Sequence, residues 1–333
     1  MLALAPMQDV TDLPFWRLMT AYGGADLYYT EYFRVHGDSR LDRAILASIV
    51  ENPTGRPVVA QMIGNDPAAL VRTARELERH PIAAVDLNLG CPAPVVYRKC
   101  AGGGLLRELD RVDRILGALR EAISGKFTVK TRLGFSDAAD YDRLLALLAK
   151  HGVDLVTVHG RTVADGYRSA VRYDLIRHAV EQLPCPVLAN GNIGTPQRAL
   201  AVLEETGCSG LMIGRGAIRN PWLFEQIRAA LRGEVWRFPV GRDVLAYVEA
   251  LYGAVSGPDP VEKLHVQKMK KYLNFLGIGV EPTGQFLHEI RRVATRGDFF
   301  DVCRRYLDHG EPMRLEPYEL VLAERDPLAG EHG

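Results

Sequence analysis

An amide and a thiol directly follow one short apolar segment of the chain. Residues 83–87 are apolar apart from one aspartate, and the next five are Asn88-Leu89-Gly90-Cys91-Pro92. The amide can donate and accept hydrogen bonds at once. The thiol can act as an acid or, with a lowered pKa beside a base, as a nucleophile. A strand that served only the core would end in an ordinary turn, so this spacing indicates a reaction site.

Seven other short apolar segments also end in polar or glycine-rich residues. They end in Pro6-Met7, Thr30-Glu31, Gln61, Lys130 with Arg132, His159 with Arg161, Asn190-Gly191, and Gly214-Arg215-Gly216. The carboxyl ends of parallel strands meet on one side of a barrel, where the chemistry of that fold lies. We therefore expect these side chains to converge on one site.

The elements that position these residues alternate between strand and helix. The expected strands are 2–5, 26–30, 57–62, 83–88, 126–132, 153–158, 185–189 and 209–213. Their continuous apolar character is typical of a parallel sheet that is covered on both faces. Eight strand–helix units in about 230 residues predict an α/β fold of the TIM (β/α)8 type. A doubly wound open sheet is the alternative, disfavoured because no Gly-x-Gly-x-x-Gly follows the first strand.

Helix signals complete the predicted organisation. Asp66-Pro67, Thr195-Pro196 and Asn220-Pro221 each combine an N-cap residue with a proline of the first turn. Leucines at helical spacing predict a helix over 141–150. We expect a catalytic barrel over 1–235, a linker at 233–239, a small all-helical domain over 240–310 and a peripheral tail over 311–333.

Composition excludes several classes of protein. Lys+Arg and Asp+Glu balance at 41 each, so RNA contact would depend on local basic patches. The five cysteines form no C-x-x-C and the nine histidines no H-x-x-x-H, so we expect neither a disulfide framework nor a bound metal. No apolar run is long enough for a membrane span, and we expect no signal peptide because the opening Met-Leu-Ala-Leu-Ala-Pro is short and lacks basic residues. We expect a cytoplasmic protein.

The last two strand ends indicate a phosphate site. Glycines in Asn190-Gly191-Asn192 and Gly214-Arg215-Gly216 allow close approach of the backbone, at the usual phosphate position of this fold. Gln61, Lys130 and His159 beside such a site suggest flavin mononucleotide (FMN), because Lys130 can offset the negative charge of a reduced flavin. A phosphate-sugar isomerase or aldolase stays open at this point, as does a buried lysine that merely pairs with a carboxylate.

The ordered set of motifs resembles the tRNA-dihydrouridine synthases over nearly the whole chain. Besides Asn88–Pro92, the matching segments are Ala5-Pro6-Met7, Thr30-Glu31, Gln61, Gly102-Gly103-Gly104-Leu105-Leu106, Lys130-Thr131-Arg132-Leu133-Gly134, His159-Gly160-Arg161-Thr162, Asn190-Gly191 and Met212-Ile213-Gly214-Arg215-Gly216. The resemblance implies reduction of the C5–C6 double bond of D-loop uridines by FMN that NADPH recharges.

The resemblance also implies roles for individual residues. Cys91 would protonate C5 of the uracil while hydride from the flavin reaches C6. Asn88 would read the edge of the uracil, and Tyr167 would contact the target base. FMN would be held by Ala5, Pro6, Met7, Gln61, Lys130, His159, Asn190, Gly191, Asn192, Gly214 and Arg215. The tRNA would be bound by Glu31, Arg34, Asn88, Arg161 and Tyr167. Local positive charge, independently of the resemblance, adds Arg98, Lys99, Lys268 and Lys271 as expected tRNA contacts.

The flipped target uridine would enter the pocket from a folded tRNA. Segments 30–35 and 268–273 are similar to the C-type bacterial enzymes, which act at position 16, whereas segment 220–224 is closer to the B type, which acts at position 17. We expect position 16. Residues 240–309 carry ten Lys/Arg against nine Asp/Glu, so the basic character is patchy.

Two further functions stay open from the sequence. An FMN-dependent dehydrogenase of a free pyrimidine, of the dihydroorotate type, would explain Lys130 and the phosphate loops but gives no role to the helical domain. A barrel-derived RNA-binding module without redox chemistry would carry no flavin.

Overall fold

The chain forms two compact units in the computed structural model, which describes residues 1–256 and 261–318. The first unit comprises Met1–Leu13, Ala25–Ile193 and Arg198–Ile213. The second comprises Pro14–Gly24, Gly194–Gln197 and Gly214–Gly333. The predicted domain boundary at 235–240 falls inside the second unit and stays a prediction.

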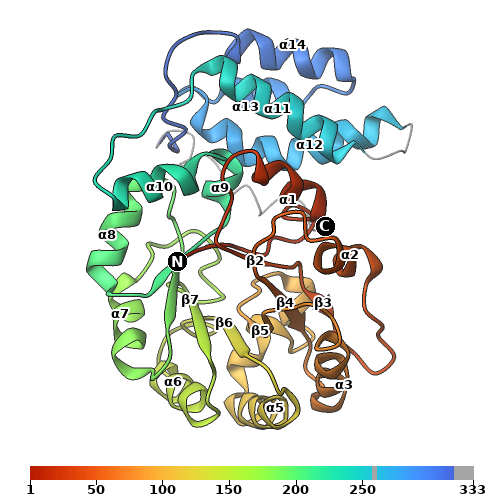
Figure 1. Cartoon of the computed structure of the whole chain (residues 1–333), viewed down its shortest axis with the longest axis vertical. Coiled ribbons are helices and arrows are strands. Elements are labelled where there is room, and N and C mark those ends of the chain that lie inside the picture. Colours follow the sequence, from red (N-terminus) through yellow and green to blue (C-terminus); the bar gives the residue numbers. More distant parts are fainter. Residues whose placement is uncertain (257–260, 319–333) are drawn as a thin grey trace. The chain divides into compact units, whose positions relative to one another are not determined.

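A closed parallel β-barrel forms the centre of the first unit (Figure 1). The strands follow the order β2-β1-β9-β8-β7-β6-β5-β4-β3, and a further pairing of β2 with β4 closes the ring. They are β1 (Leu2–Leu4), β2 (Leu27–Tyr29), β3 (Phe33–Arg34), β4 (Val58–Ile63), β5 (Ala84–Leu89), β6 (Phe127–Arg132), β7 (Leu155–His159), β8 (Val187–Asn190) and β9 (Gly210–Ile213). The predicted TIM barrel is confirmed. The short β3, which pairs with β4 at the edge, was not predicted because two residues show no apolar pattern.

Helices surround these strands, with α3 beside α5, α5 beside α6 and α6 beside α7 (Figure 1). Asp66 caps α3 as predicted, because its carboxylate accepts a hydrogen bond from the Ala69 amide. The predicted helix at 141–150 is confirmed, and its leucines are buried. The helices of this unit are α2 (Arg43–Glu51), α3 (Pro67–Leu77), α4 (Pro94–Tyr97), η1 (Gly102–Arg107), α5 (Leu109–Ala122), α6 (Tyr141–Lys150) and α7 (Tyr173–Gln182). The next helix, α8 (Pro196–Thr206), begins at the predicted Pro196 in the second unit and ends in the first.

The inward face of the barrel changes from apolar to polar along its strands. Its apolar part is a cluster of Ala3, Ala5, Leu27, Tyr29, Val59, Ala84, Leu188 and Met212, with Leu155 packed against it. Alternate residues of a strand share one face. The same inward face therefore continues with Gln61 after Val59, with Asp86 and Asn88 after Ala84, and with Thr157 and His159 after Leu155.

The described part of the second unit is mainly helical. Its helices are most of α1 (Leu13–Thr20), and α9 (Arg215–Arg219), α10 (Leu223–Leu231), α11 (Gly241–Val255), α12 (Glu262–Leu276), η2 (Gly277–Gly279), α13 (Gln285–Ile290) and α14 (Arg296–Leu307). One face of α12 is apolar, since Tyr272, Phe275 and Leu276 are buried. Within the described ranges, no helix combines the length and apolar character that crossing a membrane would require.

Two features of the second unit refine the sequence predictions. The helix expected at Asn220-Pro221 begins at Leu223 instead, because Asn220 ends α9 and its Nδ2 donates to Oε1 of Gln226 at 2.8 Å. Of the predicted peripheral tail, residues 311–318 are described, and there Met313 donates its amide proton to the carbonyl of Pro239. Residues 319–333 lie outside the described part.

Candidate active site at the carboxyl ends of the barrel strands

A carboxylate that is completely buried lies beneath the predicted site. Oδ1 of Asp86 accepts a hydrogen bond from Oγ1 of Thr128 at 2.6 Å, and Oδ2 accepts one from Nε2 of Gln61 at 2.8 Å. Burial raises the pKa of Asp86 to about 6, although these two hydrogen bonds and the charge of Lys130 oppose the shift. Because an ionised carboxylate is unfavourable at such depth, Asp86 does not serve as ordinary core packing.

Asn88 connects this carboxylate to the loop that contains the thiol. Its Nδ2 donates to Oε1 of Gln61 at 2.8 Å. Its Oδ1 accepts from the backbone amides of Gly90 and Cys91, each at 2.9 Å. Three of the four hydrogen-bonding positions of the amide are thus used within the protein. The predicted role of Asn88 in reading a base stays a prediction.

The Gly102–Gly104 segment packs against the loop that contains Cys91. The amide of Gly103 donates to the carbonyl of Cys91 at 3.2 Å. Gly102 has a φ of +52°, and a Cβ atom there would lie 3.0 Å from the Cβ of Cys91. The positive φ of Gly102 and its short distance to Cys91 both favour glycine at this position. The Gly102–Gly104 segment therefore packs directly against the cysteine.

The thiol of Cys91 is half-buried and carries its proton at neutral pH. Burial raises its pKa above the ordinary value, although the Ala93 amide, the charges of Lys130 and Arg132, and a hydrogen bond with Tyr32 lower it in part. Burial and the nearby thiolate charge likewise raise the pKa of Tyr32 to about 12, so its hydroxyl is the donor to the sulfur. This environment is suited to a proton donor rather than to an activated nucleophile.

The ammonium of Lys130, near the end of β6, has no partner in the part of the chain that the structure describes. Among the described residues, none forms a hydrogen bond or an ion pair with it, and the oxygens of Asp86 are occupied by Thr128 and Gln61. Burial and the charge of Arg132 lower the pKa of Lys130 to about 8, against the opposing effect of Asp86 and Cys91. A lysine that merely pairs with a carboxylate would show an ion pair, and none is present among the described residues. Lys130 has its charge available for a ligand.

Arg132 links the loops that follow two neighbouring strands. Its Nε donates to the carbonyl of Gly90 at 3.0 Å, and its Nη1 donates to the carbonyls of Thr162 and Gly166 at 2.7 and 2.8 Å. The ring of Tyr167 lies 5.4 Å from the guanidinium carbon and 6.1 Å from the ring of His159. The structure therefore brings the predicted residues His159 and Tyr167 together.

The loop after β8 is held by side chains from the β7–α7 region. Nη1 of Arg161 donates to Oδ1 of Asn192 at 3.3 Å, and the hydroxyl of Tyr173 donates to the carbonyl of Gly191 at 2.6 Å. Gly191 and Asn192 both have positive φ, +126° and +49°. Asn190 donates to the carbonyl of Met212 at 2.8 Å. In this state the buried Arg161 braces the loop, and its predicted contact with tRNA stays a prediction.

The first two strands end in a region that is rich in carboxylates. Glu31 accepts a hydrogen bond from the Val10 amide at 3.2 Å. Burial and the charges of Asp12 and Asp9 raise the pKa of Glu31 to about 7. The preceding loop is held by Thr11, whose Oγ1 accepts from the Met7 amide and donates to the carbonyl of Ala5. Ala5, Pro6 and Met7 therefore form a segment directly after β1 that Thr11 holds in place.

The remaining predicted residues lie on loops or helix surfaces. Arg34 is exposed, with its guanidinium carbon 5.8 Å from the ring centre of Tyr32. Arg98 and Lys99 are exposed just beyond α4. In the second unit, Gly214 precedes α9 and Arg215 begins it, while Lys268 and Lys271 lie on α12. Ligand contacts of these residues stay predictions.

Two residues of this site, Asp86 and Tyr32, were not predicted from the sequence. The signal for Asp86 was present, since it stands two residues before Asn88 and so shares its inward face. A carboxylate inside an apolar strand that is buried on both faces requires a reason. Tyr32 gave no signal, because the hydrogen bond to Cys91 joins residues far apart in the chain.

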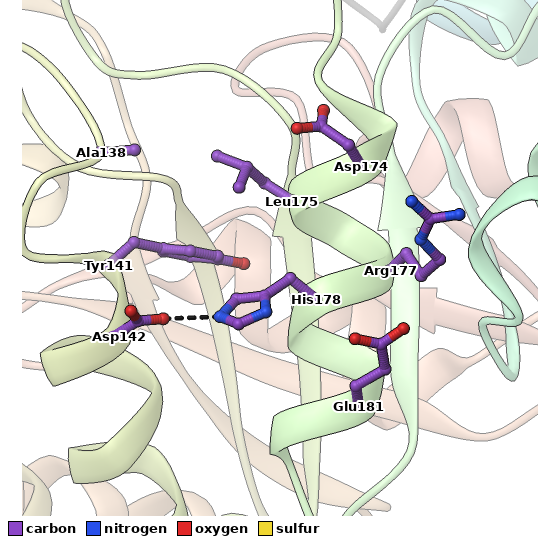
Figure 2. A pocket seen from close by; sticks show the side chains of 8 residues that line it. All are labelled: Ala138, Tyr141, Asp142, Asp174, Leu175, Arg177, His178 and Glu181. Atoms are coloured by element: carbon purple, nitrogen blue, oxygen red, sulfur yellow. Dashed lines mark hydrogen bonds and ion pairs between the residues drawn. The ribbon is translucent and has the colours of Figure 1, made fainter.

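A separate pocket lies against α6 and α7 (Figure 2). It is lined by Ala138, Tyr141, Asp142, Asp174, Leu175, Arg177, His178 and Glu181. Nε2 of His178 lies 2.6 Å from Oδ1 of Asp142. None of the predicted site residues lines this pocket, and its charged side chains belong to the surfaces of two helices.

Comparison with known proteins identifies the family. The family described as dihydrouridine synthase (Dus) matches residues 3–308. A relative from Pseudomonas putida, named tRNA-dihydrouridine synthase B, is 36% identical over 267 residues, which cover 77% of this chain and 78% of that protein. A protein of the same name from Xanthomonas axonopodis pv. citri is 33% identical over 313 residues, 92% of each chain. The tRNA-dihydrouridine(16) synthase of Haemophilus influenzae is 32% identical over 305 residues, 89% of this chain and 96% of that protein. The resemblance read from the motifs is confirmed, and the chain belongs to the dihydrouridine synthase family.

Proposed function

We propose that this protein reduces a uridine of tRNA to 5,6-dihydrouridine, with FMN as bound cofactor and NADPH as reductant. The observation that carries the proposal is the thiol of Cys91 near the ammonium of Lys130, which has no partner among the described residues, at the carboxyl ends of β5 and β6. Membership of the family and the names of the relatives support tRNA as the substrate.

The residues at these strand ends fit a flavin. Lys130 has no partner among the described residues, and its charge suits the electron-rich edge of the ring. The positive φ of Gly191 and Asn192 gives the loop after β8 a turned backbone that suits a phosphate. When bound, the flavin supplies the hydride that reaches C6 of the uracil.

The protein itself supplies the proton. Cys91 transfers the proton of its Sγ to C5 of the uracil, and the thiolate that results is stabilised by the nearby charges of Lys130 and Arg132. Water then returns a proton to the sulfur. The hydrogen bonds from the Gly90 and Cys91 amides to Asn88 keep the loop fixed during this transfer.

Replacement of the thiol tests this function. Cys91→Ala should keep its bound flavin and lose dihydrouridine formation by roughly 10²–10⁴-fold, the usual contribution of a general acid. The measurement is dihydrouridine in tRNA by mass spectrometry, after the variant replaces the native gene in its host. The matched control is Cys185→Ala, which removes another half-buried thiol before β8, at the amino end of that strand.

Each result of this test has a clear meaning. Loss of dihydrouridine in Cys91→Ala with normal levels in Cys185→Ala supports the proposal. Normal dihydrouridine in Cys91→Ala removes Cys91 from the mechanism. Failure of the purified wild-type protein, supplied with FMN and NADPH, to form dihydrouridine in unmodified tRNA would refute the function itself.

We propose position 16 of the D-loop as the target. The proposal rests on segments 30–35 and 268–273, which are similar to the C-type enzymes. The relatives that match this chain include proteins named tRNA-dihydrouridine synthase B and one named tRNA-dihydrouridine(16) synthase. Mapping the dihydrouridines of tRNA from the deletion strain tests it. Loss at position 17 with position 16 intact would contradict it.

A further inference from the structure

A chain of hydrogen bonds connects the interior of the barrel to the backbone of Cys91. We call Thr128, Asp86, Gln61 and Asn88 the Asp86 network. Its links are Thr128 to Asp86 at 2.6 Å, Gln61 to Asp86 at 2.8 Å and Asn88 to Gln61 at 2.8 Å. The last links are the amides of Gly90 and Cys91, each 2.9 Å from Oδ1 of Asn88. All the members lie in the first unit.

The network has a direction that its carboxylate sets. An ionised carboxylate only accepts hydrogen bonds, so Gln61 must turn its NH2 group toward Asp86. The oxygen of Gln61 then faces Asn88, which must in turn present its own NH2 group. This leaves the oxygen of Asn88 facing the loop, where two backbone amides need an acceptor. A neutral amide at position 86 would allow either orientation at every link.

We propose that Asp86 is a positioning residue whose carboxylate orients the Gln61 and Asn88 amides and thereby holds the Cys91 loop for proton transfer. The inference rests on the proposed function, because it assigns Asp86 a role in aligning the donor of that reaction. Asp86 acts through Gln61 and Asn88 and does not itself touch the substrate.

The energetics of Asp86 support a functional rather than a structural role. Its pKa is raised by burial, so the folded state favours the neutral form and the ionised carboxylate destabilises the fold at neutral pH. A side chain retained for stability would show the opposite shift. Buried polar networks whose members are each hydrogen-bonded specify one arrangement of a buried site.

Asp86→Asn tests the proposal, because it removes the charge and keeps the shape. We expect an unchanged or higher melting temperature. The amides of Gly90 and Cys91 should exchange with solvent about tenfold faster, since their acceptor is no longer held in one orientation. This exchange is measured by mass spectrometry of the peptide that contains them, in the protein without tRNA. Turnover should fall about tenfold or more, with little change in KM for tRNA.

Asp154→Asn is the matched control. Asp154 is a half-buried carboxylate just before β7, at the amino end of the strand, where it binds Arg120 and the Phe127 amide at 2.9 and 2.8 Å. This variant should lower the melting temperature and leave both the exchange at Gly90 and Cys91 and the turnover at permissive temperature unchanged.

Two outcomes would overturn the inference. One is an Asp86→Asn protein whose Gly90 and Cys91 amides exchange at the wild-type rate. The other is a loss of turnover that merely follows a lower melting temperature, as in the control. If Asp86→Asn does not fold, Thr128→Val removes one donor to Asp86 and should give a smaller increase in the same exchange; no increase would equally refute the role.

The experiment separates this inference from the proposed function. If the wild-type protein forms no dihydrouridine, the proposed function fails, while the exchange rates still report whether Asp86 holds the loop. If wild-type protein is active and Asp86→Asn is equally active with unchanged exchange, the function stands and the inference fails.

Discussion

The two ends of one barrel treat their ionisable side chains in opposite ways. At the amino end, Asp154 lies between β6 and β7, and burial would raise its pKa, but hydrogen bonds from the Phe127 amide and Arg120 outweigh burial and lower it. At the carboxyl end, burial raises the pKa of Asp86 to about 6 and lowers that of Lys130 to about 8. The charged state is favoured at one end and disfavoured at the other.

This difference separates groups that stabilise the fold from groups whose charged forms are buried at a cost in stability. Asp154 has an arginine and a backbone donor as partners, whereas the ammonium of Lys130 has none among the described residues. Unpaired or poorly solvated charges of this kind concentrate at functional sites. The carboxyl end of the barrel is therefore less stable than it would be with apolar side chains, and more reactive.

The largest expected effect comes from Lys130→Met. The folded pKa of Lys130 lies below its unfolded value near 10.5, so its charge destabilises the folded protein at any pH below about 8. We expect the variant without cofactor to be more stable, by about 1–3 kcal/mol in urea unfolding, and to lose most of its bound flavin and its activity. A fully yellow and active variant, or one that is less stable than wild type, would contradict the comparison of the two ends.

The pH dependence of turnover is the next effect in size. Because the pKa of Lys130 is about 8, its positive charge is present below this pH and is lost as the pH rises through it. We expect turnover with saturating tRNA to fall above about pH 8. Lys130→Arg keeps its charge to a much higher pH, so the fall in turnover should shift to higher pH if this variant binds flavin. A profile that is flat to pH 9.5 in the wild type would argue against a charged Lys130.

Features of this site that depend on local sequence patterns were predictable, whereas contacts between residues far apart in the chain were not. The strands and their polar ends were predictable, because apolar segments of four to seven residues alternate with capped helices such as the one that begins after Asp66. Cys91, Lys130 and His159 were predictable because each stands at or just beyond the end of such a segment. Cysteine, lysine and histidine are not the residue types that usually form turns.

The contacts among these residues were not predictable from the sequence. The direction of the Asp86 network depends on which strands are neighbours and on their register, such as Gln61 opposite Asp86 and Asn88 opposite Lys130. A one-residue shift would turn these side chains to the other face of the sheet. The bracing of Arg132 against Gly90 likewise depends on loop geometry that no local pattern encodes.

Asp154→Asn tests the stabilising end of the comparison through acid unfolding. The folded pKa of Asp154 is lowered, so its contribution to stability is present above its unfolded pKa near 3.8 and is lost as the pH falls through the lower folded value. We expect the variant to lose about 1–2 kcal/mol at pH 7 and less at low pH. Urea unfolding at pH 7 and at low pH measures both. An equal loss at the two pH values would show that packing, rather than charge, sustains this end.

The smallest effect is expected for Tyr32→Phe, at the reactive end. The Tyr32 hydroxyl donates a hydrogen bond to Cys91 Sγ and so lowers the pKa of the thiol in part, against the larger effect of burial. Removing the hydroxyl should raise the thiol pKa and slow alkylation of Cys91 by iodoacetamide severalfold at pH 8.5, read from the peptide that contains Cys91. Alkylation of Cys185 in the same sample is the internal control. Because the role that we propose for Cys91 is that of a proton donor and not of a thiolate, dihydrouridine formation should change much less than alkylation does. Equal loss of both would mean that Tyr32 supports the shape of the loop rather than the proton affinity of the sulfur.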